Sequence, residues 1–164
     1  MNLKPIGTVR NAVLEPPRPP YDWDNVVSRI EIEPDLTEAL DNLDEFSHII
    51  VLFWMDRLAK KTLPLKVRPR HDPNRPLIGL FASRSPHRPN SIGKTTVKLL
   101  KRERNVLTVS GLDAIDGTPV IDIKPYQPDY DSPSDAHPAG SSHIRKADVS
   151  RGALPKCLKR LTLS

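Results

Sequence analysis

Two arginines follow an apolar run in the middle of the chain and could bind an anion. The run Ile78–Ala82 predicts a buried strand, and a loop containing Arg84, His87, Arg88 and Asn90 follows directly. Two prolines stiffen this loop, so its guanidiniums would be partly preorganised to bind a carboxylate or phosphate in bidentate fashion. A surface turn with solvated arginines is an equally good interpretation of this stretch taken alone.

A second stretch places carboxylates and backbone amides around a predicted turn. Asp113 and Asp116 precede Gly117 and Thr118, and Asp-Gly between apolar runs is a strong signal for a β-hairpin. Carboxylates suit ribose hydroxyls or an amino group, and the amides of Gly117 and Thr118 would approach a ligand closely. The two stretches together suit a ligand with ribose, amine and carboxylate, such as S-adenosylmethionine, although this chemistry alone does not single it out. The other interpretation is a plain hairpin turn.

Two common kinds of site are not supported by the sequence. Gly93-Lys94-Thr95 has the end of a phosphate-binding loop, but Arg88 occupies the position five residues before Gly93 where the motif needs glycine. The following residues predict a strand, so the helix N-terminus of such a site is missing too. The histidines are scattered and form no spacing typical of a metal site, so no metal is expected.

The elements that must position these residues are mostly short strands. They predict a mainly β protein, a small closed or nearly closed β-barrel with one short helix and an extended C-terminal tail. The apolar run Ser47–Asp56 predicts a central strand buried on both faces, and Leu36–Leu43 has the spacing of a short amphipathic helix. The other predicted strands are Leu3–Val9, Val26–Ile32, Thr95–Leu100, Val106–Val109 and Val120–Ile123, with a turn at Arg104 and Asn105.

The expected organisation is a barrel domain over residues 1–126. Residues 127–164 would form a proline-rich connector and a basic tail, residues 143–164, packed on the same domain. The proline-rich stretch Asn11–Asp24 predicts an extended loop, in which Tyr21 and Trp23 would either stack on a base or pin the loop to the core.

Charge and composition narrow the class of partner. Residues 57–75 carry seven bases and one acid, and residues 84–104 repeat that ratio, so a polyanion such as RNA or DNA is the expected partner and a solvated basic face is the alternative. A single cysteine, Cys157, fits a cytoplasmic protein. No signal peptide is apparent, and the longest apolar run is far too short to cross a membrane.

Three blocks of the sequence resemble one known family. FSHIIVLFWM, GLFASRSPHRPNSIG and GLDAIDGTPVIDIKPY, within residues 46–126, together look like the TsaA/TrmO-like family. The resemblance implies a small β-barrel S-adenosylmethionine-dependent methyltransferase, acting on N6 of the threonylcarbamoyl-adenosine next to the anticodon of tRNA. It also implies a homodimer. The family's usual proline is replaced by Ser91, and the N-terminal loop lacks the family's Pro-Arg-Gln.

The resemblance assigns roles to individual residues. The cofactor-binding residues it implies are Arg84, Lys94, Ile115, Asp116, Gly117, Thr118, Asp56 and Arg57. The substrate-binding residues are His87, Arg88, Asn90 and Tyr126. The chemistry of methyl transfer, and not the resemblance, makes Asp113 or Asp116 the candidate to accept a proton from the adenine amine. Two alternatives remain open: a barrel that binds RNA or a nucleotide without chemistry, and a methyltransferase acting on a small molecule.

Overall fold

The computed structural model describes residues 2–17, 21–57, 63–69 and 72–136. The chain divides into two compact units, Met1–Tyr126 and Gln127–Ser164. The basic tail predicted for residues 143–164 lies outside the described residues. In the second unit, α1 (Pro128–Asp131) is one short turn, and the Asp131 carboxylate accepts a hydrogen bond from the Gln127 amide at 2.8 Å.

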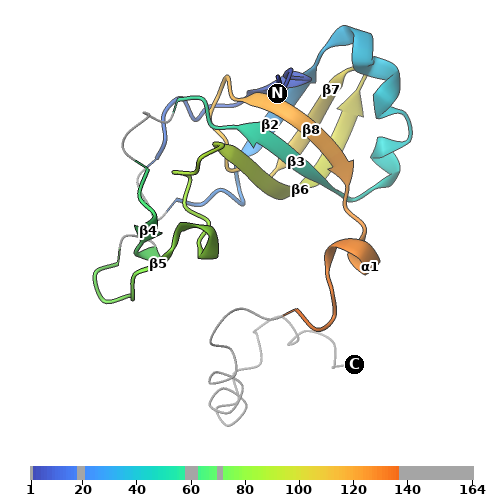
Figure 1. The fold of residues 1–164 in the computed structure, drawn as a ribbon. Coiled ribbons are helices and arrows are strands. Elements are labelled where there is room, and N and C mark those ends of the chain that lie inside the picture. The colour runs from blue at the N-terminus through green and yellow to red at the C-terminus, as the bar shows by residue number, and fades with distance from the viewer. Residues whose placement is uncertain (1, 18–20, 58–62, 70–71, 137–164) are drawn as a thin grey trace, which may run out of the picture. The chain divides into compact units, whose positions relative to one another are not determined.

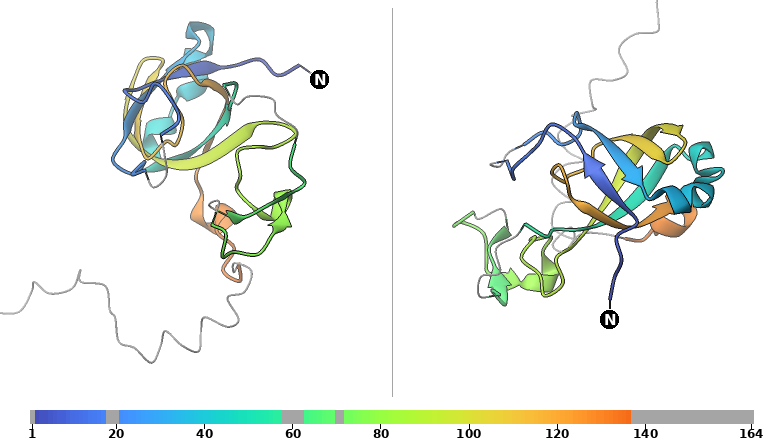
Figure 2. Two further views of the ribbon diagram at one scale, coloured as in Figure 1. Left: turned by 90° about the vertical axis from the view of Figure 1, so that its left-hand side faces the viewer. Right: turned by 90° about the horizontal axis from the view of Figure 1, so that it is seen from above.

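The first unit is a closed antiparallel β-barrel, which confirms the predicted fold class (Figure 1). Its wall follows the order β1-β2-β7-β6-β3-β8, and the further views in Figure 2 show the strands wrapping around a common interior. The wall strands are β1 (Gly7–Arg10), β2 (Val27–Ile32), β3 (His48–Trp54), β6 (Ile92–Glu103), β7 (Val106–Ser110) and β8 (Pro119–Pro125). All the strands predicted for the barrel are present, but β1 begins at Gly7 instead of Leu3.

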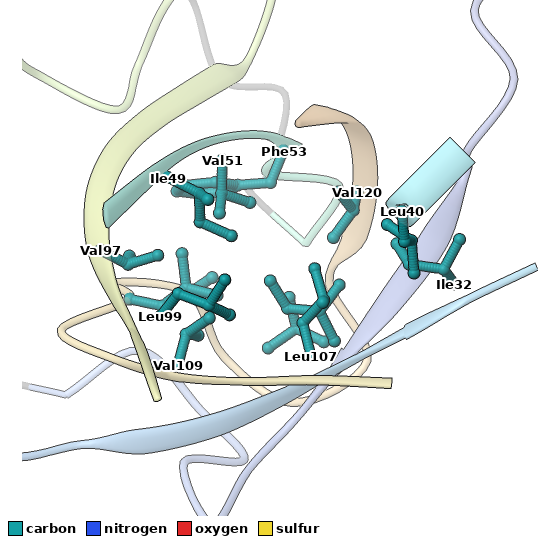
Figure 3. Close-up of a cluster of buried hydrophobic side chains, with 14 residues drawn as sticks. Ile32, Leu40, Ile49, Val51, Phe53, Val97, Leu99, Leu107, Val109 and Val120 are labelled. Atoms are coloured by element: carbon teal, nitrogen blue, oxygen red, sulfur yellow. The ribbon is translucent and has the colours of Figure 1, made fainter. Parts of the chain in front are cut away.

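The core fills the inside of this barrel with aliphatic side chains (Figure 3). Alternation along each strand sends every second residue inward, so Ile49, Val51 and Phe53 of β3 are at most 3% exposed. On the outer face of β3, Ile50 is buried but Leu52 and Trp54 are half-buried. The prediction of burial on both faces is therefore correct only in part. Side chains alone fill a barrel this small, so the site must lie at its rim.

The predicted helix Leu36–Leu43 is wrong in type and extent. Two 3-10 helices, η1 (Pro34–Leu40) and η2 (Leu43–Glu45), occupy this region, and Asn42 between them has a left-handed φ of 61°. Only Leu40 is buried there, while Leu36 is 37% exposed. One buried leucine is too little apolar contact to hold a regular α-helix of this length.

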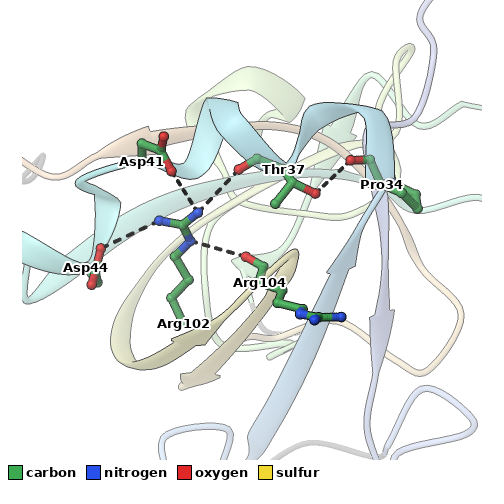
Figure 4. A network of polar contacts seen from close by, with 6 residues as sticks. All are labelled: Pro34, Thr37, Asp41, Asp44, Arg102 and Arg104. Carbon is green, nitrogen blue, oxygen red and sulfur yellow. Dashed lines mark hydrogen bonds and ion pairs between the residues drawn. The ribbon is translucent and has the colours of Figure 1, made fainter.

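Arg102 ties the two 3-10 helices to the barrel (Figure 4). Its guanidinium donates to the Asp41 carboxylate at 2.8 Å, to the Arg104 carbonyl at 3.1 Å and to the Thr37 carbonyl at 3.4 Å. The side chain is only 19% exposed, and Asp44 lies 4.0 Å from the same group. A single arginine therefore binds one carbonyl of η1, one carbonyl of the β6–β7 turn and the carboxylate between the two short helices.

Replacing Arg102 by Ala is expected to lower the free energy of unfolding by about 1.5–3 kcal/mol, the range for hydrogen bonds to a charged group. The matched control is Lys101→Ala. Lys101 forms an ion pair with Glu103 at 2.7 Å, but its side chain is 61% exposed. That pair should contribute less than about 1 kcal/mol. Urea unfolding of both variants measures the difference, and equal losses would show that the network is not a structural tie.

The apolar run Ile78–Ala82 is not a buried strand. Its first two residues form β5 (Ile78–Gly79), which pairs only with β4 (Lys66–Val67), and η4 (Leu80–Ala82) follows. The β4–β5 ribbon lies beside the barrel and outside its wall (Figures 1 and 2). Leu80 is buried, whereas Phe81 is 75% exposed.

The hairpin predicted at Asp116-Gly117 is also absent. β8 pairs with β1 and β3, not with the preceding strand β7. The residues between β7 and β8 therefore cross the end of the barrel instead of turning back on themselves. The tight hairpin lies at the predicted Arg104–Asn105 turn, where Arg104 has a φ of 55°. No helix in the described part of the chain is long and apolar enough to cross a membrane.

Candidate functional site

Two adjoining pockets open at one end of the barrel. The first, which we call the arginine pocket, has a volume of about 780 Å³ and includes Arg84, Arg88 and Lys94 in its wall. The second, the aspartate-turn pocket, has a volume of about 670 Å³ and includes Asp56, Arg57, Ile115 and Thr118. The residues common to both are Trp23, Phe53, Met55, Pro86 and Asp113. The two stretches singled out by the sequence therefore meet at one continuous site.

Phe53 separates the core from the pockets. Its ring packs on Gly93 of the neighbouring strand, so closely that a β-carbon at Gly93 would lie 2.3 Å from the ring. A bulge between Leu52 and Phe53 interrupts the pairing of β3 with β8 at the same place. Glycine thus lets an aromatic side chain lie against a strand, and the bulge changes the direction of the strand at the site.

The arginine loop is held by its own serines. The Ser83 hydroxyl donates to the Leu80 carbonyl at 2.7 Å and accepts from the Ser85 amide at 3.2 Å. Arg84 donates through one Nη to the Lys94 carbonyl at 3.1 Å, and Arg88 donates to the Ser83 carbonyl at 2.9 Å. Each guanidinium has five N–H donors, so both keep donors for an anion.

Asp113 stands where the two pockets join. Its carboxylate accepts a hydrogen bond from the Thr95 hydroxyl, and Thr95 points into the mouth of the barrel from β6. Desolvation by the surrounding chain raises the pKa of Asp113 from its ordinary value of 3.8, although the side chain still reaches solvent. Thr95, a backbone hydrogen bond and Arg84 lower this pKa, but desolvation outweighs them. A carboxylate with a raised pKa at a pocket junction is suited to accept a proton.

The Asp116 side chain forms a hydrogen bond within the protein instead of facing a pocket. Its carboxylate accepts a hydrogen bond from the Asn11 amide at 3.1 Å, and it lines neither pocket. The Asn11 side chain also donates to the Ala114 carbonyl at 2.8 Å and to the buried Ser28 hydroxyl at 2.9 Å. Asn11 and Asp116 therefore hold the turn at residues 115–118, which we call the aspartate turn, against β1 and β2.

The amides of the aspartate turn are not available to a ligand, contrary to the sequence-based expectation. The Gly117 amide donates to the Val9 carbonyl at 2.8 Å, and the Thr118 amide donates to the Ile115 carbonyl at 3.3 Å. The turn contributes the side chains of Ile115 and Thr118 to the pocket instead. The physical reason is that β1 runs beside the turn and accepts the Gly117 amide through Val9, while the Thr118 amide closes the turn itself.

Arg57 covers the glycine of this turn. Gly117 has a φ of 79°, and a β-carbon there would lie 2.7 Å from the Arg57 guanidinium. The same guanidinium donates to the Leu14 carbonyl at 3.1 Å. Arg57 therefore links the proline-rich loop to the aspartate turn and forms part of the wall between them.

Three predicted substrate residues lie elsewhere. His87 is exposed and lines neither pocket, although its loop does. Asn90 borders a separate groove of about 430 Å³ that also includes Trp54 and Ile92. Tyr126 follows the far end of β8, where its ring packs edge-on against His48 with centroids 6.5 Å apart. Of the four predicted substrate residues, only Arg88 lines the arginine pocket.

Several pocket residues were not assigned a role from the sequence. Phe53, Met55 and Thr95 were treated only as parts of strands, and the available signal was their position near the ends of the predicted strands Ser47–Asp56 and Thr95–Leu100. Trp23 lines both pockets, and Tyr21 lies edge-on to it with ring centroids 4.8 Å apart. The proline-rich loop thus brings an aromatic surface to the site. The described residues contain no group of three or more side chains that could hold a metal ion.

Known proteins resemble this chain over most of its length. Residues 8–132 match the family described as the tRNA-methyltransferase O N-terminal domain. An S-adenosyl-L-methionine-binding protein of Archaeoglobus fulgidus is 42% identical over 133 residues, which cover 80% of this chain and 93% of that protein. A tRNA (adenine(37)-N6)-methyltransferase of Mus musculus is 36% identical over 168 residues, which cover 98% of this chain and 39% of the mouse protein.

Solved structures show the same likeness. A crystal structure of TrmO from Pseudomonas aeruginosa has a TM-score of 0.67 and 34% identity, covering 85% of this chain and 62% of that chain. Some relatives are considerably longer than the barrel. The chain spans 37% of another Archaeoglobus fulgidus relative and 60% of a Pseudomonas aeruginosa relative.

Proposed function

This chain belongs to the tRNA-methyltransferase O N-terminal domain family, and from that premise we propose that it is an S-adenosylmethionine-dependent methyltransferase acting on N6 of adenosine 37 in tRNA. The observation that carries the proposal is the joined pair of pockets with Asp113 at their junction. Relatives bearing the names of an S-adenosyl-L-methionine-binding protein and of a tRNA (adenine(37)-N6)-methyltransferase support it.

The proposed cofactor pose uses the different chemistry of the two pockets. The carboxylate of the methionine part suits the guanidinium of Arg84 in the arginine pocket. The adenosine part suits the less polar aspartate-turn pocket, where Trp23 offers a ring for stacking and Arg57 and Ile115 form further wall. This pose puts the sulfonium group near Asp113. Both volumes lie within the range of typical small-molecule sites.

In the proposed reaction, the N6 atom of the adenine attacks the methyl carbon of the sulfonium. The new N–C bond forms as the C–S bond breaks. The electron pair of the C–S bond stays on sulfur and gives the neutral thioether S-adenosylhomocysteine. Asp113 accepts the proton that N6 loses and passes it to solvent. The site mainly aligns donor and acceptor for in-line transfer, because the sulfonium is already a strong electrophile.

Methyl transfer to defined RNA tests the proposal. Purified protein should transfer labelled methyl groups from S-adenosylmethionine to an anticodon stem-loop with adenosine at position 37, and mass spectrometry should place the label on N6. Parallel stem-loops with and without the threonylcarbamoyl group identify the true acceptor. If the protein binds S-adenosylmethionine and RNA but methylates neither stem-loop, the non-catalytic binding module is favoured. Methyl transfer only to small molecules would also contradict the proposal.

A homodimer is part of the same proposal. Tyr126 and Asn90 lie away from the pockets within one chain, so a role for either in substrate binding requires a second copy to bring it to the site. Light scattering on the purified protein measures the oligomeric state directly.

A further inference from the structure

Phe81 exposes an aromatic ring at the edge of the site. It lies in η4, next to buried Leu80, yet it is 75% exposed. A buried phenylalanine is among the strongest contributors to a core, and the described part of the chain does not use this ring in that way. Exposure alone does not mark a binding surface, since Leu65 and Tyr130 are even more exposed, but an open aromatic ring offers a face on which a partner can stack.

Arg88 is already aligned with this ring. Its guanidinium carbon lies 5.5 Å from the ring centroid of Phe81, which is within the range of a cation–π contact. The Ser83 carbonyl accepts a hydrogen bond from the same guanidinium. The Ser83 amide and hydroxyl both donate hydrogen bonds to the Leu80 carbonyl, at 3.1 Å and 2.7 Å. Ring and guanidinium are therefore held by one rigid turn, and Arg88 also lines the arginine pocket.

The charge around the pair suits a polyanion. The described residues from 63 to 94 contain one acid, Asp72, which is paired with Arg75 at 3.4 Å. The lysines and arginines described in this range are Lys66, Arg68, Arg75, Arg84, Arg88 and Lys94. An aromatic ring beside a guanidinium on a basic surface is the usual platform for an unpaired base of RNA, since every base has a face that can stack.

We propose that Phe81 and Arg88 form a stacking platform for a nucleobase of the RNA substrate, next to the nucleotide whose N6 atom reaches Asp113. The inference rests on the proposed function for the identity of the RNA. A base stacked on this platform would fix the position of the flanking strand and leave its neighbour turned out of the stack toward Asp113. Phe81 would then contribute to RNA affinity and not to cofactor binding.

The test compares three variants in direct binding of an anticodon stem-loop RNA, with S-adenosylmethionine affinity measured in parallel. Phe81→Leu keeps an apolar side chain but removes the ring, and it should weaken RNA binding about tenfold with unchanged cofactor affinity. Phe81→Tyr keeps the ring and should stay within about twofold of the wild type. Leu65→Ala removes another exposed apolar side chain near the ribbon, 78% exposed, and should also have little effect.

Salt dependence separates stacking from a charge effect. Phe81→Leu should leave the slope of log K against log salt unchanged, whereas Arg68→Ala should reduce it, because only the second change removes a cation near phosphates. Unchanged RNA affinity in Phe81→Leu would overturn the inference even if the wild type methylates tRNA. A change of oligomeric state in Phe81→Leu would also overturn it, in favour of a contact between two copies. If the wild type binds no S-adenosylmethionine, the proposed function fails. The RNA affinities of the Phe81 variants would still show whether the ring binds a nucleobase.

Discussion

Replacing Asp113 by Asn is expected to lower the rate constant of methyl transfer by about 100-fold to about 10,000-fold, with S-adenosylmethionine affinity nearly unchanged. The carboxylate stands at the junction of the two pockets, where the proton of N6 must leave, and an amide cannot accept that proton. An Asn at this position still accepts the hydrogen bond from Thr95, so the local geometry should persist. Single-turnover methylation of a stem-loop RNA measures the change.

Asp116→Asn is the matched control for this variant. Asp116 uses its carboxylate to accept a hydrogen bond from the Asn11 amide, and an amide oxygen can do the same. Its transfer rate should therefore stay within about threefold of the wild type if Asp113 is the proton acceptor. A large loss in Asp116→Asn with little loss in Asp113→Asn would reverse the assignment of the two residues.

The stability of Asp113→Asn separates a functional role from a structural one. The folded-state pKa of Asp113 is raised, so the folded protein binds this proton more tightly than the unfolded chain does. The free energy of unfolding therefore falls as the pH rises from 3.8 through the folded-state pKa, and at neutral pH the ionised group is unfavourable. Asp113→Asn should be at least as stable as the wild type at neutral pH. A clear loss of stability in urea unfolding would point to a structural carboxylate.

The activity of the wild type should fall on the acid side as Asp113 becomes protonated. Thr95 lowers the pKa of Asp113 through its hydrogen bond, so Thr95→Val should raise that pKa further. The acid limb of the pH–rate profile should consequently move to higher pH in Thr95→Val. An acid limb at the same pH in both proteins would show that another group controls it.

Arg84→Ala is expected to weaken S-adenosylmethionine binding by about 10-fold to about 150-fold, the cost of losing a hydrogen bond to a charged group. Arg84 borders the arginine pocket and is positioned by the Lys94 carbonyl. Arg84→Lys should recover only part of the affinity, because an ammonium keeps the charge but not the planar fork of donors. Calorimetric titration of the three proteins measures these differences.

A ligand without the carboxylate makes this experiment specific. Methylthioadenosine has the nucleoside and sulfur but no amino-acid part, so Arg84→Ala should bind it as tightly as the wild type does. Arg10→Ala is the control for a general loss of positive charge, since Arg10 lies on β1 in an exposed pair with Glu31 at 3.2 Å. An equal loss for both ligands in Arg84→Ala would show that Arg84 supports the pocket without contacting the carboxylate.

The barrel could be predicted because strand side chains alternate with a period of two. In the predicted strand Val26–Ile32 every second residue shares a face, and the structure buries Ser28, Ile30 and Ile32 on one of them. The shorter apolar segments were less informative. Leu36–Leu43 has helical spacing, yet only Leu40 finds enough contact to become buried, and the backbone breaks at Asn42. Hydrophobicity alone also placed Phe81 inside, although the folded chain leaves it exposed.

The fold class, the family and the two stretches that carry the polar side chains could all be inferred from local sequence patterns. Which of those side chains face the same pockets depends on the closure of the barrel, since β8 joins β1 and β3 and carries the aspartate turn across the barrel end. That closure brings Thr95 to Asp113 and Trp23 to both pockets, and it uses the Gly117 amide in a hydrogen bond to Val9 of β1. The physical reason is that local patterns report the periodicity of the backbone. Neighbours at a site depend instead on long-range strand pairing, which no local pattern contains.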